Sequence, residues 1–152
     1  MNDYGCESIE VVDNGSGIER SNFKSLCLRH ATSKISSFDD LDSVLSYGFR
    51  GEALSSLCSL AESIHVCTRD GSSSVGHRLE YDRQGTLVSE TPMSRPKGTS
   101  VIVNELFKPQ PVRRVHLKKN IKRQYAQLLS VLQSYAVISV GTRFVCTNKP
   151  AK

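Results

Sequence analysis

Hydrophobic and polar positions in the first part of the chain predict one strand followed by helices. Residues 8–12 alternate and are β-branched, which is typical of a strand, and the glycine-containing run 13–17 ends it. Apolar residues at steps of three and four, together with a capping-box-like start at Ser37, predict three helical segments. These are residues 19–28, with Phe23, Leu26 and Cys27 on one face, residues 37–45, and residues 52–61.

The hydrophobic period changes to two in the middle of the chain. Three alternating segments separated by Asp-Gly and Gln-Gly turns predict an antiparallel meander, which a fourth strand follows. These strands are residues 63–68, 75–81, 86–89 and 98–103. An apolar stripe predicts a long helix over 114–136, and a last strand is expected over 142–146. Because helices alternate with hairpins and no repeat or long linker divides the chain, the sequence predicts one α+β two-layer sandwich.

Composition indicates a globular protein away from membranes. The 152 residues are 38% hydrophobic and 23% charged, enough for one core and unlike a disordered chain. No apolar run approaches the roughly 20 residues that span a bilayer, and no signal-peptide pattern opens the chain. The five cysteines lack Cys-x-x-Cys spacing and the four histidines are scattered, so no metal site is expected. Most cysteines have apolar neighbours and are interpreted as buried thiols of a reducing compartment.

The net charge of +5 conceals an asymmetry. Residues 1–105 have a net charge of −5, whereas residues 106–152 carry ten basic residues and no acidic one. Such a region attracts phosphate backbones. Four basic residues lie off the apolar stripe of the long helix: Lys118, Lys119, Lys122 and Arg123. They form either a DNA-binding face or the solvated side of an amphipathic helix.

Two glycine-containing segments are candidates for nucleotide chemistry. The motif Asp13-x-Gly15-x-Gly17 places a carboxylate at a strand end, where it can accept a hydrogen bond from the amino group of a base. The alternative is an ordinary turn, since Asp-Asn-Gly is a common turn sequence. Residues 48–54 (Gly-Phe-Arg-Gly-Glu-Ala-Leu) lead into a helix whose first amides lack intrahelical acceptors and can bind phosphate. The alternative there is a plain helix start. The polar stretch with Thr32, Ser33 and Lys34 has hydroxyls and a cation that could contact a nucleotide. The alternative is an ordinary solvated surface loop.

Taken together and in this order, these segments resemble the ATPase domain of the MutL family of DNA mismatch-repair proteins, within the GHKL superfamily. The resemblance rests on residues 13–17, 30–35, 48–54 and 98–99, and residues 106–113 look like the family's next motif. The 48–54 block is the most specific of them. Pro-Val-Arg at 111–113 and Leu-Ser-Ser-Leu-Cys at 54–58 point to the eukaryotic PMS-type branch.

The resemblance implies a role for each matching residue. Asp13 would bind the adenine amino group, with Thr99 supporting it directly or through water. Amides of Glu52, Ala53 and Leu54 would hold phosphates, and Thr32, Ser33 and Lys34 would belong to a lid. The glycine-containing motifs complete the expected ATP-binding set: Gly15, Gly17, Gly48, Phe49, Arg50 and Gly51.

The resemblance also predicts that parts of the family's ATPase domain lie outside residues 1–152. In the family, an upstream helix supplies a glutamate that activates water and an asparagine that binds magnesium. We therefore expect a partial GHKL (Bergerat-type) domain, without that motif and without the C-terminal transducer domain, and negligible hydrolysis of ATP. Glu52 is rejected as the base, because a helix N-terminus stabilises the carboxylate anion. No catalytic residue or metal ligand is assigned.

The expected function is that of a nuclear ATP-binding module in mismatch repair. The resemblance implies that ATP with magnesium is the cofactor, and that nucleotide binding closes the lid and drives N-terminal association. The implied partners are a MutL homologue in a heterodimer, a MutS-type mismatch-recognition complex and non-specific DNA. A non-enzymatic remnant that binds only a partner or DNA is the first alternative. The second, another GHKL enzyme such as a histidine kinase, lacks a visible phospho-acceptor helix.

Overall fold

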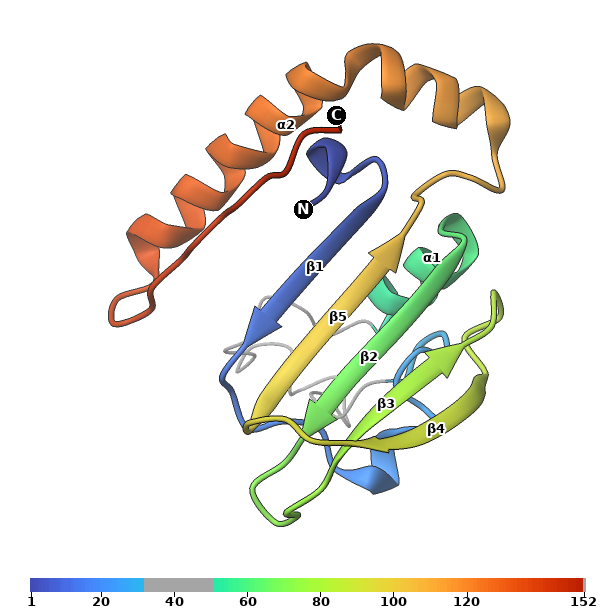
Figure 1. Cartoon of the computed structure of the whole chain (residues 1–152), viewed down its shortest axis with the longest axis vertical. Helices are drawn as coiled ribbons and strands as arrows, with labels where there is room; N and C mark the ends of the chain where they lie inside the picture. The colour runs from blue at the N-terminus through green and yellow to red at the C-terminus, as the bar shows by residue number, and fades with distance from the viewer. Residues whose placement is uncertain (32–50, 152) are drawn as a thin grey trace, which may run out of the picture.

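The computed structural model describes residues 1–31 and 51–151 and contains one five-stranded sheet (Figure 1). The strands lie in the order β1-β5-β2-β3-β4, and each pair of neighbouring strands is antiparallel. The elements are η1 (Asp3–Gly5), β1 (Ser8–Asp13), η2 (Arg20–Asn22), α1 (Ala53–Leu60), β2 (Ser63–Arg69), β3 (Gly76–Tyr81), β4 (Leu87–Met93), β5 (Gly98–Asn104) and α2 (Pro111–Ile138). The predicted α+β class and the meander of β2, β3 and β4 are confirmed, and the fourth predicted strand, β5, lies between β1 and β2.

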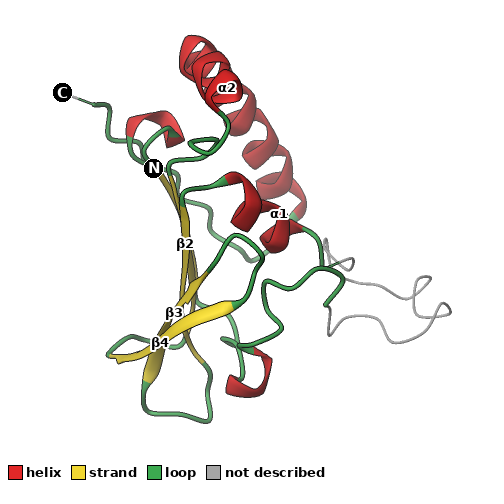
Figure 2. Cartoon of the chain, turned by 90° about the vertical axis from the view of Figure 1, so that its right-hand side faces the viewer, coloured by secondary structure: helices red, strands yellow, loops and turns green. Residues whose placement is uncertain are grey.

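The core lies on the face of the sheet that α1 covers (Figure 2). Val101 of β5 is paired with Val11 on one side and Val66 on the other, so this row of side chains shares one face. The helix predicted over 52–61 is confirmed as α1, which contributes Cys58 to the core. The buried cluster contains Phe23, Cys27, Cys58, Ala61, Ile64, Val66, Leu79, Tyr81 and Val103. Four of the five cysteines are buried free thiols, as expected, and Cys146 is exposed.

The predicted helix over 19–28 is wrong. Only Arg20–Asn22 forms a 3₁₀ turn, and turns of the same i→i−3 kind continue to Ala31. The carbonyl of Phe23, which would accept the Cys27 amide in an α-helix, accepts the Tyr81 hydroxyl at 2.8 Å. Burial raises the pKa of Tyr81, so this phenol remains a donor. Phe23 and Cys27 are buried as predicted, but a tertiary hydrogen bond replaces the local one.

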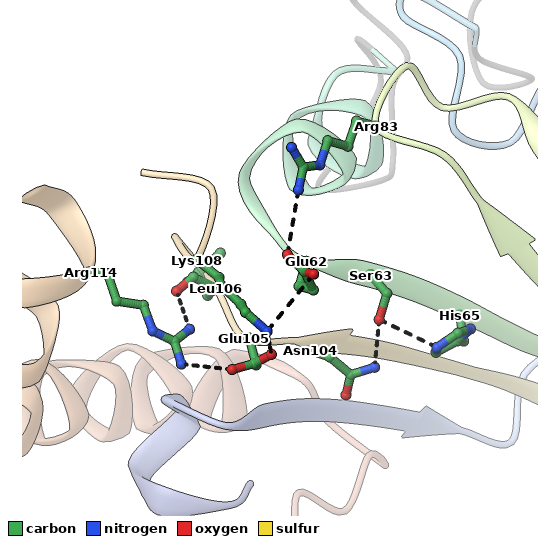
Figure 3. A network of polar contacts seen from close by, with 9 residues as sticks. All are labelled: Glu62, Ser63, His65, Arg83, Asn104, Glu105, Leu106, Lys108 and Arg114. Carbon is green, nitrogen blue, oxygen red and sulfur yellow. Dashed lines mark hydrogen bonds and ion pairs between the residues drawn. The ribbon is translucent and has the colours of Figure 1, made fainter. Parts of the chain in front are cut away.

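A polar network holds the start of α2 against the end of β5 (Figure 3). Arg114 donates to the Leu106 carbonyl at 2.9 Å and pairs with Glu105 at 3.3 Å. Lys108 contacts the carboxylates of both Glu105 and Glu62. The helix begins at Pro111 rather than at 114, because proline is favoured in a first turn, where its missing N–H costs no hydrogen bond.

α2 contacts the N-terminal segment, and no residue of the helix is buried. The rings of Tyr4 and Tyr125 meet edge to face with centroids 5.4 Å apart. The predicted stripe of Leu117, Ile121, Tyr125, Leu128 and Leu132 is half-buried, and Tyr135 is 39% exposed.

The predicted strand over 142–146 is wrong, because no strand lies beside it among the described residues. The chain after α2 runs back along the helix instead (Figure 1). Tyr125 contacts Cys146, and the backbone of Met1 and Asp3 binds that of Thr147 and Lys149. The predicted helix over 37–45 lies outside the described residues.

Candidate functional site

Asp13 ends β1 directly beside Thr99 at the start of β5. Its Oδ1 accepts the amide of Gly15 at 2.8 Å and the amide of Thr99 at 3.2 Å. No described residue donates to Oδ2. The carboxylate is therefore held by backbone amides on one oxygen, and the other can accept a donor from a ligand.

Gly17 brings the loop after β1 against the end of β2. Its φ is 79°, and a Cβ at this position would lie 2.1 Å from the carbonyl oxygen of Arg69. Only glycine fits such an approach in that conformation. At Gly15, a Cβ would lie 2.9 Å from Oδ1 of Asp13. The glycines therefore do more than form a turn, since they pack the loop against both Asp13 and β2.

Two threonines continue the row of Asp13 across the sheet, with Thr99 of β5 paired to Asp13 and Thr68 of β2 paired to Thr99. Thr68 is fully buried, and 9% of Thr99 is exposed. Their hydroxyl oxygens are 3.2 Å apart, and the Thr68 hydroxyl accepts the Ile18 amide at 2.9 Å. Sequence reasoning identified Thr99 and missed Thr68. The available signal was a threonine on the core-facing side of β2, in line with Ile64 and Val66.

We call Asp13, Gly15, Gly17, Thr68 and Thr99 the Asp13 cluster. Its polar groups offer an oriented carboxylate and a hydroxyl to a ligand. A ligand group that presents an N–H donor is complementary to the free oxygen of this carboxylate.

The second predicted group lies at the start of α1. Glu52 immediately precedes the helix and makes no side-chain cap, and the amides of Ala53 and Leu54 belong to the first turn. Gly51 has a φ of 63°, and a Cβ there would lie 2.2 Å from the Ala31 carbonyl oxygen. His30 lies 3.6 Å from Glu52, and both side chains are largely exposed. Close packing of two chain segments thus requires glycine before this helix.

The structure does not join the two groups by direct contacts. Between the described residues, no hydrogen bond or ion pair links the Asp13 cluster to the start of α1. Six predicted site residues lie outside the described residues: Thr32, Ser33, Lys34, Gly48, Phe49 and Arg50.

The basic residues Lys118, Lys119, Lys122 and Arg123 are all exposed on α2. We call them the α2 basic patch. None of them takes part in a salt bridge with another described residue, whereas Arg114 and Lys108 nearby are paired with glutamates. The patch is therefore available to an external anion.

Within residues 1–31 and 51–151, no cluster of three or more His, Cys, Asp or Glu side chains could hold a metal ion. In the same part of the chain, no helix is long and apolar enough to cross a membrane.

Comparison with known proteins places the chain among mismatch-repair sequences. It is 51% identical to the mismatch repair endonuclease pms1 of Dictyostelium discoideum over its whole length, which is 15% of that protein. It is also 51% identical to PMS2 of Mus musculus over 98% of the chain and 17% of that protein. The chain thus spans about a sixth of these relatives. No protein-family model matches it.

Solved structures support the same assignment. The N-terminal domain of a DNA repair protein superposes with a TM-score of 0.75 at 46% identity, over 91% of this chain and 38% of that one. The Aquifex aeolicus MutL ATPase domain complexed with ADP has a TM-score of 0.56 at 24% identity, over 85% of this chain and 43% of that one. At that identity the second match shows the fold alone, which this chain shares with that MutL ATPase domain.

Proposed function

Because these 152 residues belong to the MutL/PMS family of DNA mismatch-repair proteins, we propose that they form part of an ATP-binding module. Residues 1–152 are assigned to one partial GHKL domain. In this proposal nucleotide binding closes a lid that includes Thr32, Ser33 and Lys34, and closure drives association with a MutL-homologue partner. The module acts in the nucleus with a MutS-type recognition complex and DNA.

The observation that carries the proposal is the Asp13 carboxylate. Two backbone amides hold Oδ1, which leaves Oδ2 as an oriented acceptor for the amino group of adenine. An ionised acceptor makes a stronger hydrogen bond than a neutral one. Amides of Glu52, Ala53 and Leu54 would bind the phosphates with help from the helix dipole. Magnesium would accompany ATP, and no described residue is assigned to it.

Calorimetric titration of ADP tests the proposal. We expect Asp13→Asn to weaken binding by about ten- to hundredfold, because a hydrogen bond to a charged acceptor contributes about 1.5–3 kcal/mol. Asparagine keeps the shape and a carbonyl acceptor but loses the charge.

Asp82→Asn is the matched control. Oδ1 of Asp82 also accepts two backbone amides, those of Gln84 and Thr86, but in the turn between β3 and β4. Its replacement should leave ADP affinity unchanged. Equal, tight binding by wild type and Asp13→Asn would refute the role of Asp13. A folded wild-type chain that does not bind ADP would favour the alternative, a non-enzymatic piece that binds only a partner or DNA.

A second proposed activity is non-specific DNA binding by the α2 basic patch. The exposure of its four side chains and their lack of salt bridges with described residues support it. The alternative remains a solvated helix face, and the salt dependence of DNA binding by an alanine variant of the patch separates the two.

A further inference from the structure

Two half-buried arginines at one end of the sheet have no acidic partner among the described residues. Arg69 is the last residue of β2, and Arg95 lies in the connection from β4 to β5. Within residues 1–31 and 51–151 neither side chain forms a salt bridge, whereas Arg83 of the β3–β4 turn pairs with Glu62 at 3.4 Å. Their positive charges are therefore uncompensated by any ion pair in this part of the chain.

Each of the two guanidinium groups also contains a buried nitrogen without an acceptor. Arg69 donates from Nη1 to the Ser73 carbonyl at 3.4 Å, and Arg95 donates from Nε to the Pro96 carbonyl at 3.2 Å. The Nε of Arg69 and the Nη1 of Arg95 are buried and have no hydrogen-bond partner among the described residues. Because burying part of a cation without a counter-charge is costly, a bound anion would stabilise this arrangement.

Both side chains lie on the face of the sheet opposite α1. Thr68 faces the core, so Arg69, the next residue of β2, faces the other way. Thr68 is paired with His77, which places Gly76 beside Arg69 on the neighbouring strand. A Cβ on Gly76 would lie 2.6 Å from Cγ of Arg95, so the Arg95 side chain crosses the sheet at Gly76. The connection that carries Arg95 passes in front of β3 and β2 in Figure 1, and α1 lies behind them.

Acidic side chains close to the two arginines in the fold have other partners. Oδ1 of Asp70 accepts the amides of Ser72 and Ser73 in the β2–β3 hairpin. Glu80, on the same face as Arg69, pairs with Arg78 at 3.4 Å. The two neighbouring guanidinium groups thus form a site of double positive charge at the glycine gap of β3.

We propose that Arg69 and Arg95 form a binding site for a phosphomonoester dianion. A guanidinium presents parallel N–H groups that match the oxygens of a phosphate. Two positive charges are balanced by a phosphomonoester, which carries nearly two negative charges, whereas each phosphodiester of DNA carries one. Inorganic phosphate and a phosphorylated serine of another protein share this chemistry. The site faces away from the core side of the sheet that contains Thr68, so it goes beyond the proposed nucleotide binding.

Calorimetric titration of the 152-residue chain with inorganic phosphate at about pH 8 tests the site. Arg69→Gln and Arg95→Gln should each weaken binding by about ten- to hundredfold, the range for a hydrogen bond between charged groups. Gly76→Ala keeps both charges but places a methyl group against Arg95, so it should weaken binding as well.

Arg83→Gln is the matched control, because it removes the same charge from an arginine that already has a carboxylate partner. It should leave phosphate affinity unchanged. The proposal is overturned if the wild-type chain binds no phosphate, if Arg69→Gln and Arg95→Gln bind as well as wild type, or if Arg83→Gln causes an equal loss.

Urea unfolding separates an anion site from a purely structural role. In chloride, Arg95→Gln should be at least as stable as wild type, because it removes one of two neighbouring charges that lack a counter-ion. In phosphate of equal ionic strength the order should reverse, since an anion that binds only the folded state stabilises wild type. If Arg95→Gln is less stable by the same amount in both solutions, or fails to fold in chloride, the role is structural and the proposal is wrong.

Two further ligands identify the source of the phosphate group. Tighter binding of acetyl-phosphoserine amide than of inorganic phosphate would support a phosphorylated protein, and the reverse order would support free phosphate. In both cases Arg95→Gln should weaken the tighter ligand. Duplex DNA provides phosphodiesters instead. If Arg95→Gln weakens binding of duplex DNA as much as that of phosphate, the choice of a phosphomonoester is overturned.

Discussion

Two glycines of this protein share a backbone conformation but have opposite surroundings. Gly17 has a φ of 79° and Gly141 a φ of 80°. A Cβ on Gly17 would meet the backbone of Arg69 and Asp70 at 2.1–2.7 Å, whereas a Cβ on Gly141 would meet nothing within 4 Å. Comparing the two positions therefore separates conformational strain from steric exclusion at the candidate site.

We expect Gly141→Ala to lower the free energy of unfolding by about 1 kcal/mol, the cost of a left-handed conformation for a residue with a Cβ. Gly17→Ala should cost about 3 kcal/mol or more, because rigid backbone must also move. It should weaken ADP binding as well, since Gly17 positions the loop that carries Ile18 and follows Asp13. Urea unfolding and calorimetry measure the two effects. Equal losses of stability would show that the close approach to Arg69 is unimportant.

At the scale of elements, α2 combines a half-buried apolar stripe with the α2 basic patch, which forms no salt bridge with any residue that the structure describes. The helix spans 28 residues and contains no acidic residue. Its first turn is fixed by the pairing of Arg114 with Glu105, so the patch has a set position relative to the sheet. An array of exposed cations on one helix is suited to a phosphate backbone.

Replacing Lys118, Lys119, Lys122 and Arg123 by alanine should therefore weaken binding to duplex DNA at every sequence tested. The slope of log affinity against log salt should fall by about one for each phosphate that the variant no longer neutralises, up to about four. Fluorescence anisotropy at several salt concentrations gives both quantities. The control removes four exposed cations elsewhere, by replacing Lys24, Arg29, Lys97 and Lys149 with alanine. If both fourfold variants reduce the slope equally, net charge rather than the α2 basic patch governs binding.

At the scale of the whole molecule, many large apolar side chains of the described residues are exposed. Residues from the end of α2 into the following segment are among the most exposed, with Val137 at 81%, Val140 at 96% and Val145 at 70%. Ile138 and Phe144 nearby are 61% and 43% exposed. Apolar residues gathered in one region favour association more than the same residues scattered singly.

We expect this chain to self-associate as its concentration rises, through the region 137–145. The triple variant Ile138→Gln, Val140→Gln and Val145→Gln should reduce that association in sedimentation velocity experiments, because it removes apolar surface without opening the core. The control replaces three other exposed valines, Val12, Val75 and Val88, by glutamine. If the control variant reduces self-association equally, the contact between copies does not lie specifically in region 137–145.

Local pattern predicted most of the elements and part of the site. The alternation in 8–12 and in the three meander strands is a property of neighbouring residues, and these strands form as predicted. The helix start near Glu52 and the carboxylate of Asp13 were also recognisable, since both depend on short motifs. Thr68 was not, because its importance comes from contacts with Ile18 and Thr99, which are distant in sequence.

Periodicity was sufficient to predict the five strands of the sheet, α1 and α2, and composition the charge asymmetry, because neither depends on contacts between distant residues. Three other features depend on the tertiary fold. The Tyr81 hydroxyl donates to the Phe23 carbonyl in place of the local bond that the predicted α-helix would make. The segment that includes residues 142–146 contacts α2 through Cys146 and the N-terminus through Thr147, and it does not pair with a strand among the described residues. The β1–β5 register places Asp13 beside Thr99. In each case the deciding hydrogen bond or contact joins residues far apart in the chain, and a local pattern carries no information about such a partner.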